Sequence, residues 1–233
     1  MSGGAGPDGR PRYLCNHPDL PAYRSPLTAH LFIELTDHLR CPAPHDESFL
    51  VLLPDVVESR QVRSGTLGCP VCNATYPIIE GVVHFGAPTA PAPQRPSAAP
   101  HHPSTPPPVA GLAAFLGLSG PGGYIAMVGD VASLARELAG SVPGVHVAAI
   151  DPPAGTLGSD RVSVIEAPRI PVKGRQLRGV ILGGGYGAAP EWIAEGIRTV
   201  LPGLRVVGAG PAPVRDDLQV LAAADGWWVA VRR

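Results

Sequence analysis

The sequence predicts an α/β protein with two parts: a small β-rich module, residues 27–86, and a larger doubly wound Rossmann-like sheet, residues 111–233. The first observation is the stretch 87–110, which holds nine prolines and no large apolar side chain except Val109. Proline lacks the amide donor that helices and sheets require, so this stretch is expected to be an extended linker. Residues 1–26, rich in glycine, proline and polar groups, are expected to form a flexible arm.

Alternating strands and helices in the C-terminal part are the second observation. Short apolar runs, each long enough for one strand, alternate with segments whose apolar residues recur at helical spacing. Apolar strands covered on both faces are typical of a doubly wound parallel sheet. The expected strands are 124–128, 145–150, 162–165, 179–182, 204–207 and 227–231, and the expected helices are 131–139, 190–201 and 218–224.

The N-terminal module has shorter elements. Leucines at four-residue spacing predict a short helix over residues 27–39. The expected strands are 49–53, 56–62 and a pair within 76–85 that turns at Glu80-Gly81.

Three thiols and an imidazole form the third observation. They occur as two tight pairs, Cys41-Pro-Ala-Pro-His45 and Cys69-Pro-Val-Cys72, separated by enough chain for a ribbon of two or three strands. Tetrahedral zinc is bound by ligand sets of this kind, so Cys41, His45, Cys69 and Cys72 are the expected ligands. Because four protein ligands leave no position for a substrate, a structural zinc is expected rather than a catalytic one. The alternative is a pair of turns that keeps its cysteines without metal.

The remaining cysteine, Cys15, has two interpretations. It could pair with His17 as an alternative ligand set, or it could be an ordinary thiol without a metal role.

The segments LTDHLRCPAPH and GTLGCPVCNATYPIIEGVVHF, within residues 31–85, resemble a small zinc-ribbon family. Eukaryotic and archaeal members of that family bind and activate methyltransferases, and similar ribbons precede some bacterial methyltransferase domains. One difference is that the first pair ends at His45, where family members more often place a cysteine one residue earlier. Asp46 or water is the alternative fourth ligand.

The C-terminal part carries, in order, YIAMVGDVASLARELAG, VHVAAIDPP, RVSVIEAPRIPVKGRQLRGVIL, IRTVLPGLRVVGAGPAP and LAAADGWWVAVRR. This succession resembles the class I S-adenosylmethionine-dependent methyltransferases from residue 124 to the C-terminus. In this architecture a glycine turn after the first strand approaches the ligand, and an acid ending the second strand binds the ribose hydroxyls. Gly129, Asp130 and Asp151 are therefore the candidate cofactor-binding residues; Asp151 lies 22 residues after Gly129.

The first turn departs from the family pattern of an acid followed by three alternating glycines. Ala126 or Met127 stands where the family has an acid, and Val131 and Ser133 stand near the second and third glycines. Since β-branched Val131 disfavours positive φ and its side chain would project toward the ligand, the turn is expected to exclude S-adenosylmethionine. No catalytic residue is assigned.

A second glycine run, Gly183-Gly184-Gly185-Tyr186-Gly187, follows the fourth expected strand. Tyr186 has the place of the substrate-facing tyrosine in methyltransferases that modify amino groups, but the polar residue that would orient an amine is absent. A pocket loop and a permissive strand-to-helix turn are the two interpretations.

Charge and composition exclude several classes of function. A net charge of −1 argues against nucleic-acid binding, and no apolar run is long enough to span a membrane. The lack of a signal peptide and the zinc-like cysteines favour the reducing cytoplasm. The leading hypothesis is a catalytically degenerate methyltransferase-like subunit that binds another protein, and the alternative is an active S-adenosylmethionine-dependent methyltransferase. A third hypothesis, an RNA- or ribosome-associated ribbon, is disfavoured because the chain has no basic cluster.

Overall fold

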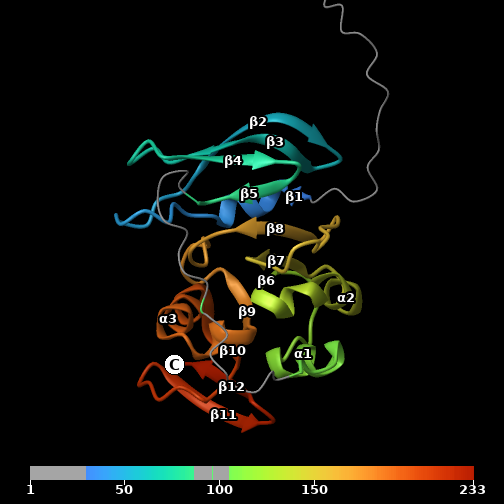
Figure 1. Cartoon of the computed structure of the whole chain (residues 1–233), viewed down its shortest axis with the longest axis vertical. Helices are drawn as coiled ribbons and strands as arrows, with labels where there is room; N and C mark the ends of the chain where they lie inside the picture. The colour runs from blue at the N-terminus through green and yellow to red at the C-terminus, as the bar shows by residue number, and fades with distance from the viewer. Residues whose placement is uncertain (1–29, 87–95, 97–104) are drawn as a thin grey trace, which may run out of the picture.

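The computed structural model describes residues 30–86, 96 and 105–233, so the expected arm and most of the expected linker lie outside the described residues. The described strands form one sheet in the order β1-β3-β4-β5-β8-β7-β6-β9-β10-β12-β11, with β2 paired to the other edge of β3 (Figure 1). No described helix is both long and apolar enough to cross a membrane. The predicted α/β fold class is confirmed.

Five parallel strands form the centre of the C-terminal part. They are β6 (Tyr124–Val128), β7 (His146–Ile150), β8 (Val162–Glu166), β9 (Leu177–Leu182) and β10 (Val200–Ala209). Their order, β8-β7-β6-β9-β10, is the order of the first five strands of a Rossmann fold. The strand order therefore reverses between β6 and β9, and this is the position where such sheets bind ligands.

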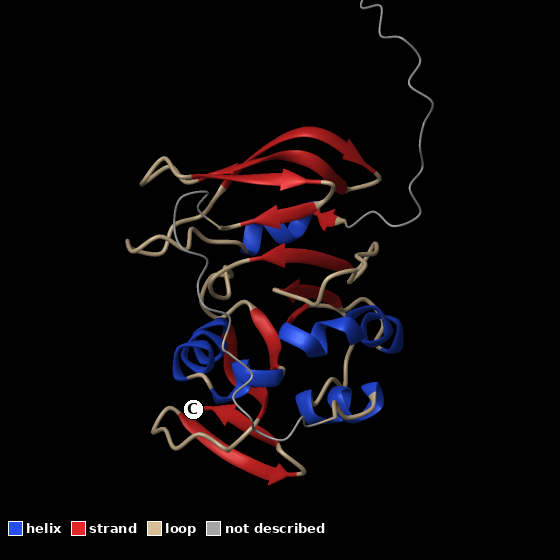
Figure 2. Ribbon diagram, in the orientation of Figure 1, coloured by secondary structure: helices blue, strands red, loops and turns tan. Residues whose placement is uncertain are grey.

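Helices cover both faces of this sheet (Figure 2). On one face, α1 (Val109–Leu116) and α2 (Ala135–Ser141), preceded by the 3-10 helix η2 (Gly129–Leu134), pack on Ile125 and Met127 of β6. On the other, α3 (Pro190–Thr199), preceded by η3 (Gly184–Ala188), packs in the cluster that holds Ala126 and Val128. The sequence did not predict α1, whose first residues fall at the end of the expected linker.

The chain ends in an antiparallel pair, β11 (Leu218–Ala224) and β12 (Trp227–Arg232), with β12 also antiparallel to β10. The prediction of a helix over 218–224 is wrong. Three consecutive alanines favour a helix locally, but Asp225 and Gly226 have φ of 53° and 75° and form a tight hairpin turn. The turn places residues 218–224 against β12, where the hydrogen bonds of a sheet replace those of a helix.

The N-terminal module consists of β1 (Leu31–Phe32), the 3-10 helix η1 (Ile33–His38) and four strands: β2 (Val51–Glu58), β3 (Gln61–Gly68), β4 (Thr75–Ile79) and β5 (Val82–His84). The β4–β5 pair follows the prediction. The helix expected over 27–39 is instead β1 followed by η1, over the residues that are described.

The two strands expected at 49–53 and 56–62 are a single strand, β2, followed by the start of β3. Pro54 does not end β2, because it lies in an edge strand where the register is already irregular. The turn comes later, at Ser59 and Arg60, which both have positive φ.

The two parts of the molecule share one sheet. β5 pairs in parallel with β8, with Val83 opposite Ile165 and His84 opposite Glu166. The loop before β9 adds further contacts: the Arg40 amide donates to the Pro171 carbonyl at 2.9 Å, and the Lys173 amide donates to the His38 carbonyl at 2.8 Å. One buried apolar cluster continues from Leu31 and Leu67 of the module to α3. Unfolding of one part should therefore expose the core of the other.

His146 lies at this junction and should make stability depend on pH. Its ring stacks on Phe32 with centroids 4.1 Å apart. Burial, followed by the charge of Arg161, lowers the pKa of His146 from its usual value of 6.5, and Asp160 opposes them only partly. The folded state thus prefers the neutral ring. The contribution of this ring to the free energy of unfolding is complete above pH 6.5 and is lost as the pH falls through the lower folded-state pKa.

Urea unfolding of the wild type and of His146→Gln at about pH 7.5 and about pH 5.5 checks this expectation. The free energy of unfolding should fall on acidification in both proteins, and by less in the variant. Because the two proteins share every other titrating group, equal losses would contradict a role for His146.

Candidate metal cluster and cofactor crevice

The structure brings the four predicted metal ligands together. The ligand atoms of Cys41, His45, Cys69 and Cys72 all lie within 4.8 Å of one another. Cys41 Sγ is 3.7 Å from Cys72 Sγ, and Cys69 Sγ is 3.4 Å from His45 Nε2. Cys69 directly follows β3, and Cys72 lies in the turn before β4. This cluster could bind zinc.

The orientation of His45 supports its place in the ligand set. Its Nδ1 lies 2.7 Å from the carbonyl oxygen of Asp46, so a proton on Nδ1 is donated to that oxygen. The lone pair of Nε2 then points toward the thiols, which is the tautomer that a metal ligand requires. Asp46 contributes its backbone carbonyl to this arrangement and is not part of the cluster.

Hydrogen bonds favour the deprotonated form of Cys69 and act in the same direction on Cys41. Burial would raise the pKa of Cys69, but hydrogen bonds from the backbone amides of Cys72 and Val71 and from the side chains of Cys72 and Cys41 together lower this pKa to about 6. Burial raises the pKa of Cys41, while the Tyr76 hydroxyl, 3.1 Å from Cys41 Sγ, opposes that shift. Tyr76 was not predicted as a site residue. Its place four residues after Cys72, within the segment that resembles a zinc ribbon, is the signal that could have found it.

The candidate cofactor residues meet at the carboxyl ends of β6 and β7. Val128 and Ile150 are opposite each other in these strands, so Gly129 and Asp151, the next residues, are neighbours at the strand ends. Gly129 has φ of 77°, which glycine adopts readily, and Asp151 has φ of 47°. The two residues therefore lie side by side at the carboxyl edge of the sheet, with Gly129 on the strand that borders the reversal of strand order.

Tyr186 occupies the space that these two residues border. A Cβ atom built on Gly129 would lie 2.6 Å from Cδ2 of Tyr186, so the phenol ring covers the glycine directly. The Tyr186 hydroxyl donates to the Asp151 carboxylate, and the ring packs edge-on against Trp192 with centroids 4.7 Å apart. Only 7% of Tyr186 is exposed. The Tyr186 side chain thus lies packed between Gly129 and Asp151.

The glycine run around Tyr186 permits this close packing. A Cβ on Gly183 would lie 2.1 Å from Asp130 Oδ1, and a Cβ on Gly187 would lie 2.2 Å from the Ala209 carbonyl oxygen. Glycine is required at Gly187 because the backbone of Ala209 approaches it, and at Gly183 because the side chains of Asp130 and Val131 occupy the space of a Cβ. The segment forms the strand-to-helix turn η3, which is one of the two interpretations offered for this run.

Val131 and Asp130 both make contacts within the protein. Val131 is 0% exposed and packs beneath Gly183, so it belongs to the core instead of projecting toward a ligand. The Asp130 carboxylate accepts a hydrogen bond from the Val131 amide at 2.8 Å and is held within its own turn. The side chain that lies between Gly129 and Asp151 is that of Tyr186, a residue distant in sequence.

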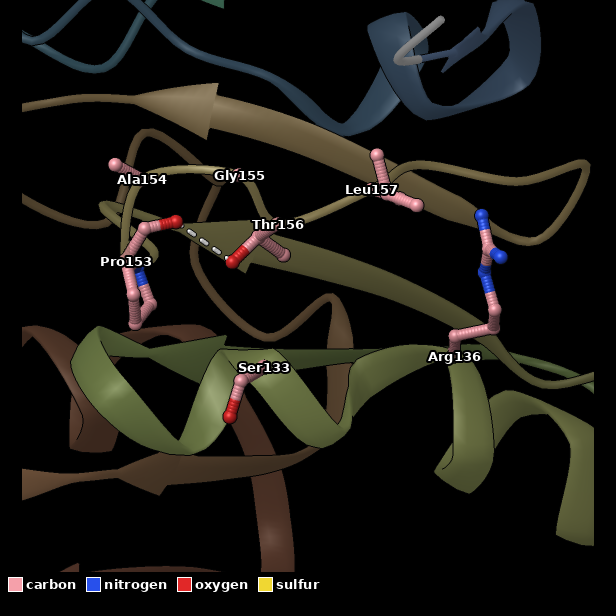
Figure 3. A pocket seen from close by; sticks show the side chains of 7 residues that line it. All are labelled: Ser133, Arg136, Pro153, Ala154, Gly155, Thr156 and Leu157. Carbon is pink, nitrogen blue, oxygen red and sulfur yellow. Dashed lines mark hydrogen bonds between the residues drawn. The ribbon is translucent and has the colours of Figure 1, made fainter. Parts of the chain in front are cut away.

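A separate hollow of about 320 Å³ lies between η2–α2 and the loop after β7 (Figure 3). It is lined by Ser133, Arg136 and residues 153–157, and not by Gly129, Asp130, Asp151 or Tyr186. Arg136 donates to the Gly158 carbonyl at 2.8 Å. The Thr156 hydroxyl donates to the Pro153 carbonyl at 2.7 Å, as the dashed line shows. These side chains satisfy the local backbone and do not converge on a common point.

No family model matches the sequence, and no curated protein is significantly similar to it. Solved structures that resemble it include a Haemonchus contortus phosphoethanolamine N-methyltransferase in complex with S-adenosylmethionine, with a TM-score of 0.36 and 14% identity over 46% of this chain and 30% of that chain. The antibiotic-resistance methyltransferase Kmr gives a TM-score of 0.38 and 14% identity over 55% of this chain and 95% of Kmr. A Corynebacterium diphtheriae precorrin-6Y C5,15-methyltransferase domain gives 0.34 and 13% identity over 54% of this chain and 95% of that domain.

The chain spans less than a third of the first of these proteins and nearly the whole length of the other two. Because every one of these TM-scores is below 0.5, the fold class rests on the strand order and connections described above. The chain is a mixed α/β protein with a largely parallel Rossmann-like sheet, methyltransferases among its structural neighbours, and a Cys/His cluster that could bind zinc.

Proposed function

We propose that this chain is a zinc-binding, methyltransferase-like protein that is catalytically degenerate and acts as a structural or regulatory subunit for another protein. The observation that carries the proposal is the Tyr186 side chain, which lies between Gly129 and Asp151 where a cofactor would bind. The proposed location is the cytoplasm, where cysteine thiols remain reduced.

The energetic argument concerns displacement of the tyrosine. A nucleotide that contacts both Gly129 and Asp151 must move the buried phenol ring out of its packing against Trp192 and break its hydrogen bond to the Asp151 carboxylate. Loss of packing by a buried aromatic side chain costs about 3–5 kcal/mol, and a penalty of about 4 kcal/mol weakens binding about a thousandfold. S-adenosylmethionine is therefore expected not to bind at cellular concentrations.

Zinc would be held by Cys41, His45, Cys69 and Cys72 and would supply structural stabilisation only. All four positions of a tetrahedral ion are filled by protein atoms, so no position remains for a substrate or a reactive water. The edge of the N-terminal module at β5 is already paired with β8. A partner that binds this module must therefore use another of its surfaces.

An active methyltransferase is the second candidate, and one observation favours it. Gly129 and Asp151 retain the positions that a nucleotide would need, at the adjacent carboxyl ends of β6 and β7. Methyl transfer depends mainly on proximity and alignment, so the lack of an assigned acid or base does not argue against it. This function requires η3 to move Tyr186 out of the crevice.

Isothermal titration calorimetry of the full chain with S-adenosylmethionine and S-adenosylhomocysteine tests the proposal. No binding heat is expected at ligand concentrations up to about 1 mM, the upper end of typical KM values. Binding in the micromolar range would refute the degenerate function and support the active methyltransferase.

A further inference from the structure

Exposed apolar side chains concentrate on the N-terminal module. Among the described residues, eleven large apolar side chains are exposed, and seven of them lie between residues 49 and 79. The seven are Phe49, Val51, Leu53, Val56, Val57, Val71 and Ile79. Single exposed apolar residues are normal on a protein surface, but a gathered set marks an interaction site.

Strand register places several of these side chains on one face of the ribbon. Val51 of β2 and Thr75 of β4 both lie opposite Gly68 of β3. In the same way, Leu53 of β2 and Pro77 of β4 both lie opposite Thr66 of β3. Directly opposed residues point to the same face, and so do alternate residues along a strand. We define the ribbon face as Val51, Leu53, Thr75, Pro77 and Ile79, all of which are exposed.

The opposite face of the same strands already supplies the core. Leu67, Tyr76 and Ile78 alternate with the ribbon face and are at most 7% exposed. The ribbon face is therefore not part of the core, and none of its residues belongs to the two buried apolar clusters of the described residues. In Figure 1, β2, β3 and β4 form the outermost layer of the N-terminal end.

The face, rather than the strand edge, is suited to binding. The exposed edge of β2 contains Pro54, which donates no hydrogen bond, and its register with β3 shifts twice between Pro54 and Val57. Both features prevent another strand from pairing along it. The Leu53 and Ile79 side chains, exposed by 61% and 55%, are the largest aliphatic groups of the ribbon face.

Two acidic residues adjoin this face along the chain: Asp55 is two residues after Leu53, and Glu80 directly follows Ile79. Residues 46–80 contain five acids and two arginines. Arg63 pairs with Glu58, Arg60 pairs with Glu34, and Glu47 pairs with Arg198. Asp46, Asp55 and Glu80 are exposed and enter none of the ion pairs between described residues. Two copies meeting face to face would bring these acids together, so the charge disfavours self-association.

We propose that the ribbon face binds a second protein through an uncharged apolar surface bordered by lysine or arginine residues. The inference rests on the proposed subunit function and names the surface and the partner chemistry that this function would use. Leu53 and Ile79 are the apolar anchors, while Asp55 and Glu80 select the basic border and increase the rate of association.

The test uses the tagged full chain expressed in its native cells, with co-purifying proteins quantified by mass spectrometry. The amount of a stoichiometric partner that co-purifies with the double variant Leu53→Asp/Ile79→Asp should fall at least about tenfold. The reason is that loss of an interface anchor commonly weakens binding by more than this factor. The matched control, Val220→Asp/Leu221→Asp on β11, changes two exposed apolar residues at the other end of the sheet and should retain the partner.

A third variant, Asp55→Lys/Glu80→Lys, tests the charge and leaves the apolar anchors in place. With the purified partner, it should weaken binding several-fold in low salt and much less at about 0.5 M salt. Circular dichroism and zinc content verify that each variant is folded.

Three outcomes would overturn the inference in different ways. Retention of the partner by Leu53→Asp/Ile79→Asp would reject the surface while leaving the subunit function intact. A wild-type dimer in light scattering that this variant converts to a monomer would replace the partner with a second copy. A wild type without any stoichiometric partner would refute both the surface and the subunit function.

Discussion

Chelation of the metal, or the substitution Cys41→Ser, should destabilise the whole protein and not only the N-terminal module. The binding free energy of a structural zinc contributes directly to folding and reaches about 10–16 kcal/mol in isolated zinc-finger peptides. β5 and β8 share a sheet, and one buried apolar cluster continues from the N-terminal module to α3. Unfolding of the module would therefore expose that core. We expect the free energy of unfolding of the whole chain to fall by about 4–5 kcal/mol and its Tm to fall by about 10–20 °C.

Tryptophan fluorescence is the appropriate probe, because Trp192, Trp227 and Trp228 are all in the C-terminal part and at most 6% exposed. Metal analysis should find one zinc ion per chain in the wild type and none in Cys41→Ser. The control is Cys15→Ser, which removes the cysteine outside the proposed ligand set and should preserve both zinc and Tm. If the tryptophan transition is unchanged after the zinc is removed, the two parts fold independently and the shared sheet does not couple them.

The sequence predicted the features that depend on local chemistry. The metal cluster was found because its ligands are close neighbours in the chain and need only one hairpin to meet. The central strands β6 to β10 were found because strands buried on both faces have nearly continuous apolar sequences. Gly129 and Asp151 lie at adjacent strand ends because the order of strands fixes where those ends lie, and their role toward a cofactor stays a prediction.

The features that were missed depend on contacts between distant residues. The helix expected over 218–224 is β11, since β12 offers it a hydrogen-bonding edge. The parallel pairing of β5 with β8 joins segments about eighty residues apart, for which neither segment carries a local signal. Val131 was expected to block the crevice because it departs from the glycine pattern, yet the residue that fills the space is Tyr186, 55 positions later. A search restricted to the first turn could not identify it.

Tyr186→Ala should create a binding site for S-adenosylmethionine. Removal of the phenol ring uncovers Gly129 and removes the Tyr186 hydroxyl from the Asp151 carboxylate, and these are the two groups that would approach the methionine part and the ribose of the ligand. We expect dissociation constants in the micromolar range by calorimetry, compared with no measurable binding by the wild type. The same change should lower the free energy of unfolding by about 3 kcal/mol, because the ring packs against Trp192 in a nearly closed environment.

Two companion variants separate the obstruction by the ring from the loss of its hydrogen bond. Tyr186→Phe keeps the ring over Gly129 and removes only the donor to Asp151, so it should lose about 1–3 kcal/mol of stability and still fail to bind. Asp151→Ala, added to Tyr186→Ala, should abolish the gained binding if the ligand is seated as proposed. Binding by Tyr186→Phe would mean that the hydrogen bond to Asp151, and not the ring, keeps the crevice closed. Failure of a folded Tyr186→Ala to bind would show that the crevice has lost more than its space, since Gly129 and Asp151 would then be exposed without effect.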